Sequence, residues 1–232
     1  MKLILGKTVF LVLCVWSGIA QAGVTVGGTR VIYDGAKREA TLSVRNTDKR
    51  AFLIQAWVDD DGPDGDHEGA LKPPFVVTPP LFRLDAGSEN ILRIIRSGGN
   101  LPEDREAVFW MDVKSIPSMP EASKNVLQIA VKTRIKMFWR PGGLAAPKNE
   151  DYGHLTFHRQ GNDLIVTNPT PWFMSFNTLS VGGVPLKQLN LMAAPNTSTA
   201  FVLPPAASGQ DVRWTVINDY GGESQAQTAR LH

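Results

Sequence analysis

The chain has 232 residues, a formal net charge of +2 and a single cysteine. Its length exceeds the roughly 100 to 150 residues of a typical single domain, so we expect two domains with separate cores. The near-neutral charge, with no block of basic residues, gives no electrostatic reason to expect nucleic acid as a partner.

Residues 1–22 have the pattern of a cleavable export signal. Lys2 and Lys7 precede a short apolar run over residues 8–16, and the segment closes with the small-x-small sequence Ala20-Gln21-Ala22. We expect cleavage after Ala22. The apolar run is too short to span a bilayer permanently, and no later run approaches the roughly 20 apolar residues that a membrane helix needs. The sequence therefore predicts an exported protein without membrane insertion.

The only cysteine, Cys14, lies inside this expected signal. The mature chain can then form no disulfide, even in an oxidising compartment, and its stability must come from burial. Loss of the signal also removes two lysines and no acid, which leaves equal numbers of basic and acidic side chains.

Seven β-rich segments separated by turn residues follow the signal. They cover residues 24–33, 39–45, 52–58, 75–78, 90–96, 107–116 and 125–141. The breaks between them are rich in Asp, Asn, Gly and Pro, which suit turns, and no segment keeps an apolar period of 3.6 residues. Seven short strands in about 120 residues are typical of an immunoglobulin-like sandwich.

The segment 125–141 is the longest predicted strand. Its apolar residues alternate with polar ones, which puts them on one face of a strand. That face carries Leu127, Ile129, Val131, Thr133, Ile135, Met137 and Trp139, and the other carries Gln128, Lys132, Arg134, Lys136 and Arg140. From alternation alone, the apolar face is core and the polar face is solvated.

Pro141-Gly142-Gly143 interrupts the strand pattern, and we place the domain boundary there. The first domain then covers residues 23–141 and the second 142–232. Further strands are predicted at 155–159, 163–168, 172–181, 199–203, 212–218 and 224–231, which fit a second, smaller sandwich. The fold class is all-β.

Catalytic and metal-binding patterns are missing from the sequence. The acidic loop at residues 59–69 does not match a calcium loop, because Pro63 stands where a ligand is needed when the pattern starts at Asp59. His154 and His158 lack a third ligand at a recognisable spacing, so we read both as surface residues. The mature chain also has no nucleophile elbow, phosphate-binding loop or cysteine, so we expect no enzyme, no metal and no cofactor.

Several short motifs, found in order, together resemble the periplasmic pilus chaperones of the chaperone-usher family. They are Thr29-Arg30, Asp104-Arg105-Glu106, Leu127-Gln128-Ile129-Ala130, Ile135-Lys136-Met137-Phe138-Trp139-Arg140-Pro141, Asn168-Pro169-Thr170-Pro171 and Asn218-Asp219-Tyr220-Gly221-Gly222. The resemblance covers essentially the whole mature chain. It implies two immunoglobulin-like domains at an angle, with a cleft between them and the long strand at an edge of the first domain.

The resemblance also implies a function. A chaperone of this kind binds pilus subunits in the periplasm by donor-strand complementation and delivers them to an outer-membrane usher. Leu127, Ile129 and Val131 would fill the groove of a subunit that lacks one strand, whereas Ile135 and the apolar residues after it belong to the core. An exposed edge strand with alternating apolar residues is a physical template for such strand addition, and it also allows self-association.

Two further sets of residues match positions of the family. Arg30 and Lys136 match the cations that hold the terminal carboxylate of the subunit, where charge-assisted bonds would fix the register of the added strand. Glu106, Arg140 and Asp219 match a trio that ties the two domains together, since one guanidinium can serve two carboxylates. Without the resemblance, all five are ordinary solvated charges.

Two features of this chain can be compared with individual branches of the family that it resembles. Some relatives carry a disulfide in the second domain, which this mature chain cannot form. The segment 117–124 before the long strand is short, as in the branch that assembles rod-like pili.

The residues leave a second class of function open. In a secreted two-domain adhesin or carbohydrate-binding sandwich, Trp139, Trp172, Phe173 and Trp214 would form a stacking platform. This alternative leaves the cation pair and the apolar stripe unexplained.

Overall fold

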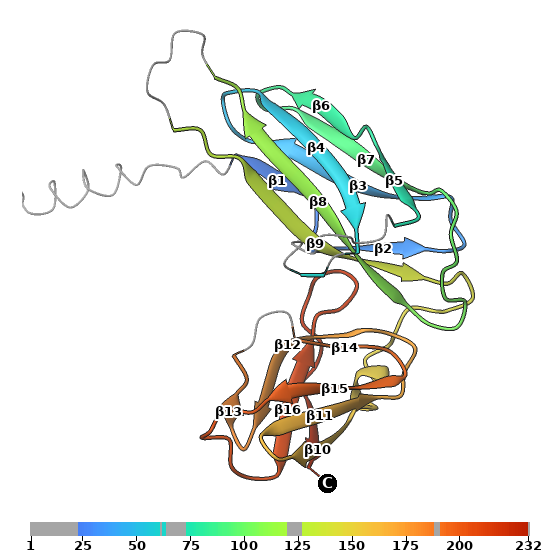
Figure 1. Cartoon of the computed structure of the whole chain (residues 1–232), viewed down its shortest axis with the longest axis vertical. Coiled ribbons are helices and arrows are strands. Elements are labelled where there is room, and N and C mark those ends of the chain that lie inside the picture. Colours follow the sequence, from blue (N-terminus) through green and yellow to red (C-terminus); the bar gives the residue numbers. More distant parts are fainter. Residues whose placement is uncertain (1–22, 61, 64–72, 120–126, 188–190, 232) are drawn as a thin grey trace, which may run out of the picture.

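The computed structural model describes residues 23–60, 62–63, 73–119, 127–187 and 191–231. The expected signal, most of the acidic loop and the first two residues of the expected long strand lie outside these ranges. The described chain folds into two β-domains, drawn one above the other in Figure 1, and its only helical element is the short 3-10 turn η1 (Asp151–Gly153). No helix in these ranges is long and apolar enough to cross a membrane.

The first domain is a sandwich of two sheets. One sheet has the order β1-β3-β7-β5 and contains β1 (Val24–Val26), β3 (Glu39–Asn46), β7 (Glu89–Arg96) and β5 (Phe75–Thr78). The other has the order β2-β9-β8-β4-β6 and contains β2 (Arg30–Asp34), β9 (Val131–Arg140), β8 (Ala107–Pro117), β4 (Phe52–Asp59) and β6 (Leu81–Leu84). This arrangement confirms the predicted sandwich.

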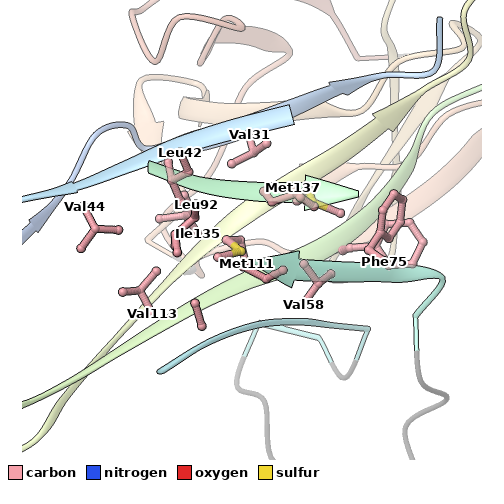
Figure 2. Close-up of a cluster of buried hydrophobic side chains, with 14 of the residues drawn as sticks. Val31, Leu42, Val44, Val58, Phe75, Leu92, Met111, Val113, Ile135 and Met137 are labelled. Atoms are coloured by element: carbon pink, nitrogen blue, oxygen red, sulfur yellow. The ribbon is translucent and has the colours of Figure 1, made fainter. Parts of the chain in front are cut away.

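Alternating side chains of both sheets fill the core of this domain. Leu42 and Leu92 come from one sheet, and Val31, Met111 and Met137 come from the other; all are buried (Figure 2). The period of two in a strand sends every second residue inward, so the neighbours of Val31 and Met137 in sequence, such as Arg30 and Lys136, lie on the opposite face of their sheet.

In this domain one predicted strand is divided in two, and one strand is absent from the prediction. The segment 24–33 is divided into β1 and β2, which belong to different sheets. The chain crosses between the sheets at Gly27 and Gly28, where a Cβ on Gly27 would lie 2.1 Å from Ser43 Oγ, so a larger residue would require Ser43 to move. β6 was not predicted; it follows Pro79-Pro80 and pairs with β4 after β5 has paired with β7.

The second domain is a smaller sandwich. One sheet contains β10 (Thr156–Gln160), β11 (Asp163–Asn168) and β15 (Thr197–Val202). The other contains β13 (Val184–Pro185), β12 (Met174–Val181), β16 (Asp211–Val216) and β17 (Gln227–Arg230), with β14 (Met192–Ala193) also paired to β12. Phe157, Leu164 and Trp214 lie in its separate core.

The chain passes between the domains after β9. The last core residue of the first domain in chain order is Trp139, and the first of the second domain is Tyr152. The expected boundary after Pro141 falls between these two cores and remains a proposal. The loop from β16 to β17 reaches back toward the first domain (Figure 1), and a small space between the domains is lined by residues of both.

Candidate functional site

The first part of β9 is a free edge of its sheet. Residues 131–135 pair only with β8 in the described part of the sheet, whereas residues 136–140 also pair with β2 on the other side. Val131 is 53% exposed, and the preceding Leu127 and Ile129 are 84% and 65% exposed. Three apolar side chains spaced by two thus face solvent at this edge.

The predicted strand over 125–141 is wrong in its length, because β9 begins only at Val131. The ladder with β8 ends at the pair Ser115–Val131. Beyond it, β8 closes with Pro117, which has no N–H to donate to a neighbouring strand. The edge position expected for the long strand therefore applies to its first part alone.

Arg30 and Lys136 occupy opposite positions in the parallel pairing of β2 with β9. The Arg30 guanidinium lies 5.6 Å from the centre of the Phe138 ring, and its Nη1 donates a hydrogen bond of 2.8 Å to the carbonyl of Ile217 in the second domain. Its Nε is buried and has no hydrogen-bond acceptor. The structure thus brings the two predicted cations together and leaves one donor of Arg30 unused.

The surroundings of this pair disfavour its positive charge. Burial, followed by the charge of Arg30, lowers the pKa of Lys136 to about 8. Burial also lowers the pKa of Arg30, although the carboxylate of Asp219 acts in the opposite direction. Among the residues whose positions are described, the Lys136 ammonium makes no ion pair. Such a pair of cations is suited to bind an anion between them.

Two other outward cations of β9 differ from Lys136. Lys132 is exposed. Arg134 is nearly buried and donates to both oxygens of Asp112, at 2.9 and 2.6 Å, and to Asp59 Oδ2 at 2.5 Å. Its guanidinium also lies 5.8 Å from the Trp110 ring centre. Arg134 is therefore neutralised by its own domain and is not available to an incoming carboxylate.

Arg140 joins the two domains. Its Nε donates to Glu106 Oε1 at 2.9 Å, and its Nη1 and Nη2 donate to the two oxygens of Asp219 at 2.6 and 2.9 Å. Glu106 and Arg140 belong to the first domain and are buried, while Asp219 lies in the loop after β16 of the second domain. The planar guanidinium thus serves one carboxylate from each domain.

Glu106 makes further contacts across the interface. Its Oε2 accepts the backbone N–H of Phe173 at 2.8 Å, and its own N–H donates to the carbonyl of Pro171 at 2.9 Å. The Phe173 ring packs against Phe138, with ring centres 5.7 Å apart. Burial raises the pKa of Glu106 even though Arg140 stabilises its charge. These partners could not be predicted from the sequence, because a backbone N–H or carbonyl carries no residue-type signature.

Two asparagines organise the motifs of the second domain. The Asn168 side chain donates to the carbonyls of Trp172 and Ala193 and accepts the N–H of Thr170, which shapes the loop that contacts Glu106. The Asn218 side chain accepts the N–H groups of Tyr220 and Gly222 and closes the loop that carries Asp219.

Gly221 in this second loop lies against the first domain. Its φ is +81°, and a Cβ there would lie 2.6 Å from Thr29 Oγ1. The close approach to the residue before Arg30 requires glycine at this position.

The other candidate residues do not form a site. Trp139 and Trp214 are 4% and 1% exposed, and their indole N–H groups donate to backbone carbonyls. The proposed aromatic platform of an adhesin is therefore wrong. His154 lies 4.0 Å from Asp151, and no group of three possible metal ligands is found among the residues in the described ranges.

Comparisons with known proteins match this architecture. A family model described as pili and flagellar-assembly chaperone, PapD N-terminal domain, matches residues 23–145, and one for the C-terminal domain of the pili assembly chaperone PapD matches residues 150–228. The probable fimbrial chaperone LpfB of Escherichia coli is 41% identical over 216 residues, which cover 92% of this chain and 90% of LpfB.

Solved structures agree with these matches. A chain of the Salmonella enterica structure of SafA pilin in complex with the SafB chaperone has a TM-score of 0.79 and 35% identity, over 90% of this chain and 96% of that chain. The periplasmic chaperone SfaE has a TM-score of 0.73 and 35% identity, over 90% of this chain and all of SfaE. The chain therefore belongs to the family of pili assembly chaperones.

Proposed function

We propose that this chain is a periplasmic chaperone that binds pilus subunits by donor-strand complementation and delivers them to an outer-membrane usher. The free edge of β9, together with residues 127–130, would complete the sheet of a subunit that lacks one strand. The observation that carries the proposal is a free apolar edge that ends at two cations, neither of which pairs with a carboxylate in the described chain.

The apolar row at this edge is the part that enters the subunit. Leu127, Ile129 and Val131 are more than half exposed, although burial of such a side chain contributes about 1.5–3 kcal/mol. Main-chain groups at the edge would supply hydrogen bonds to the last strand of the subunit, and these three side chains would fill its groove.

The position of β2 gives the direction of the added strand. β2 occupies the edge of β9 from Lys136 onward, so a strand that lies along residues 131–135 ends beside Arg30, the first residue of β2. If that end is the C-terminal carboxylate of the subunit, the added strand runs parallel to β9 and in line with β2. The carboxylate then reaches Arg30 and Lys136 together.

The two cations suit this anchoring role. The buried Nε of Arg30 lacks an acceptor, and the pKa of Lys136 is lowered to about 8 by burial and by Arg30. A carboxylate would accept charge-assisted hydrogen bonds from both side chains and relieve the repulsion between them. Lys132 and Arg134 have no part in the anchor, since one is solvated and the other is already paired.

Glu106, Arg140 and Asp219 have a structural role in this proposal. Their charged groups are bonded to one another across the domain interface, so they hold the domains in place instead of binding the subunit. The Arg30 bond to Ile217 crosses the same interface, which makes the position of the anchor depend on how the domains are held.

The proposal also includes the location of the chaperone and the delivery of its subunit to the usher. Cleavage after Ala22 would release a mature chain with domains 23–141 and 142–232 into the periplasm. Transfer of a subunit to the usher exchanges one strand for another, so the step requires no nucleotide and no cofactor, and we propose no enzymatic activity.

Co-expression of the chaperone with a pilus subunit, followed by pull-down, tests the anchor. We expect Arg30→Ala and Lys136→Ala to lose the complex, because each removes a donor to the carboxylate. Lys132→Ala is the matched control, since it removes an exposed cation from the same face of β9 and should keep the complex. Undiminished complex with both anchor variants would overturn the proposal.

A further inference from the structure

The segment 127–130 is separated from the backbone ladder of its own domain. β8 and β9 are antiparallel and end their pairing at Ser115–Val131; two residues further, the same register would place Ile129 opposite Pro117. The Ser118 N–H is directed to the carbonyl of Ala51 beside β4, so by alternation the backbone groups of Pro117 are directed to the β9 side. Pro117 has no N–H, so it cannot donate to Ile129.

One side chain takes the acceptor that the Ile129 N–H would use in a continued ladder. The Gln128 amide donates to the carbonyl of Pro117. Because neighbouring side chains in an extended chain point in opposite directions, this bond leaves Leu127 and Ile129 exposed. Ser115 Oγ also donates to the carbonyl of Val131, at 3.3 Å, so two side-chain bonds support the segment where backbone pairing stops.

We propose that Gln128 is a positioning residue that holds residues 127–130 extended beside the end of β8, ready to add to a partner strand. The inference rests on the proposed function and deepens it. A segment that is already extended loses less conformational freedom on binding, which raises affinity and the rate of association. Pro117 contributes by offering no N–H to the Ile129 carbonyl, and its own carbonyl is taken by Gln128, so the backbone of Ile129 stays out of the chaperone's own ladder.

Substitution of Gln128 tests this role. In Gln128→Met the side chain keeps its length but has no N–H to donate. We expect lower backbone order parameters at Ile129 and Ala130 in the free protein, measured by NMR relaxation, and about fivefold weaker binding of a pilus subunit, which corresponds to one lost hydrogen bond. The probe is a purified subunit from the same pilus that lacks one strand, and the loss should lie mainly in the association rate.

Three comparisons separate this role from a general structural one. Gln128→Arg keeps a long N–H donor and should restore most of the association rate. Gln55→Met changes an exposed glutamine on β4 and should match the wild type in order parameters and binding. Thermal unfolding of Gln128→Met should be unchanged, because the segment contributes no core contacts.

The outcomes also distinguish the two proposals. If the wild type binds the subunit, Arg30→Ala does not, and Gln128→Met matches the wild type in order parameters and association rate, the role of Gln128 is wrong and the proposed function stands. If the wild type does not bind the subunit, the proposed function is wrong. Order parameters at Ile129 that are equal in the wild type and in Gln128→Met overturn the positioning role by themselves.

Discussion

Arg30 and Lys136 lie opposite each other at the point where the free edge of β9 ends. The same pairing has two effects on a strand that adds to this edge. β2 blocks further pairing from Lys136 onward, and the two cations stabilise a negative charge at that point. The position where an added strand must stop is therefore the position where its terminal carboxylate is stabilised.

Replacement of Lys136 should stabilise the free chaperone. Burial, and then Arg30, lowers the pKa of Lys136 from 10.5 to about 8, so the charged ammonium is disfavoured in the folded state. At pH 7 we expect Lys136→Met to raise the free energy of unfolding by about 1–2 kcal/mol, a value discounted for remaining solvent contact. Urea unfolding measures this difference.

The pH dependence of that stability gain has a defined sign. Between pH 8 and pH 10.5 the unfolded chain binds the lysine proton more tightly than the folded chain does, so the wild type gains stability relative to Lys136→Met as pH rises. The difference between the two proteins should be largest below pH 8 and should shrink toward pH 10.5. A difference that stays constant over this range would contradict the buried charge at Lys136.

Binding of the subunit terminus should weaken at alkaline pH. A lysine with a pKa of about 8 is mostly protonated at pH 7, and only about one tenth of it is protonated at pH 9. We expect the affinity for a peptide with the C-terminal sequence of the subunit to fall about tenfold over this range. Titration calorimetry at both pH values measures the change, and the same peptide with an amidated end should show little dependence.

The alternation of residues predicted much of the fold. It placed Ile135, Met137 and Trp139 on one face of a strand, and they lie in the core. It could not show that residues 24–33 divide between two sheets, because the crossing at Gly27 depends on Ser43 in a neighbouring strand. A local pattern carries no information about which strand lies beside it.

The alternation of residues predicted less of the functional site than of the fold. Alternation puts Lys132, Arg134 and Lys136 on one face, but their partners come from other strands, so the pattern could not separate a solvated, a paired and an unpaired cation. The pairing of Arg30 with Lys136 and the trio around Arg140 came from the resemblance to a family, and the residue chemistry alone left them as ordinary surface charges. The backbone partner of Arg30, at Ile217, has no signature in a sequence.

Free chaperone should self-associate through the edge that is proposed to bind subunits. The exposed Leu127 and Ile129 and the unpaired edge of β9 can be covered by a second copy of the chain. We expect sedimentation to show a dimer that grows with concentration, and Ile129→Asp to remain monomeric. Leu53→Asp, at an exposed apolar position on β4, is the matched control. Wild-type protein that stays monomeric at all concentrations would rule out self-association through this edge.

Loss of Arg140 should destabilise the protein strongly. Glu106 and Arg140 are 4% and 7% exposed, so Arg140→Met leaves a buried carboxylate without its cation. We expect a loss of about 3–5 kcal/mol in urea unfolding. Glu106→Gln combined with Arg140→Met should recover part of it, while Arg105→Met, in an exposed pair with Asp104, should change stability by less than about 1 kcal/mol. Equal effects of Arg105→Met and Arg140→Met would show that the trio does not hold the domains.

Gly221 should be required for the contact between the domains. In Gly221→Ala the new Cβ meets Thr29 Oγ1 at 2.6 Å, and the φ of +81° strains any residue other than glycine. We expect a loss of about 1–3 kcal/mol in urea unfolding, together with weaker subunit binding because Thr29 precedes Arg30. Thr29→Ala combined with Gly221→Ala should relieve the clash and leave the backbone strain. Gly143→Ala, where a Cβ has no neighbour within 4 Å, should be nearly neutral. If Gly221→Ala is as stable as Gly143→Ala and binds the subunit equally well, the loop that carries Asp219 does not help to position Arg30.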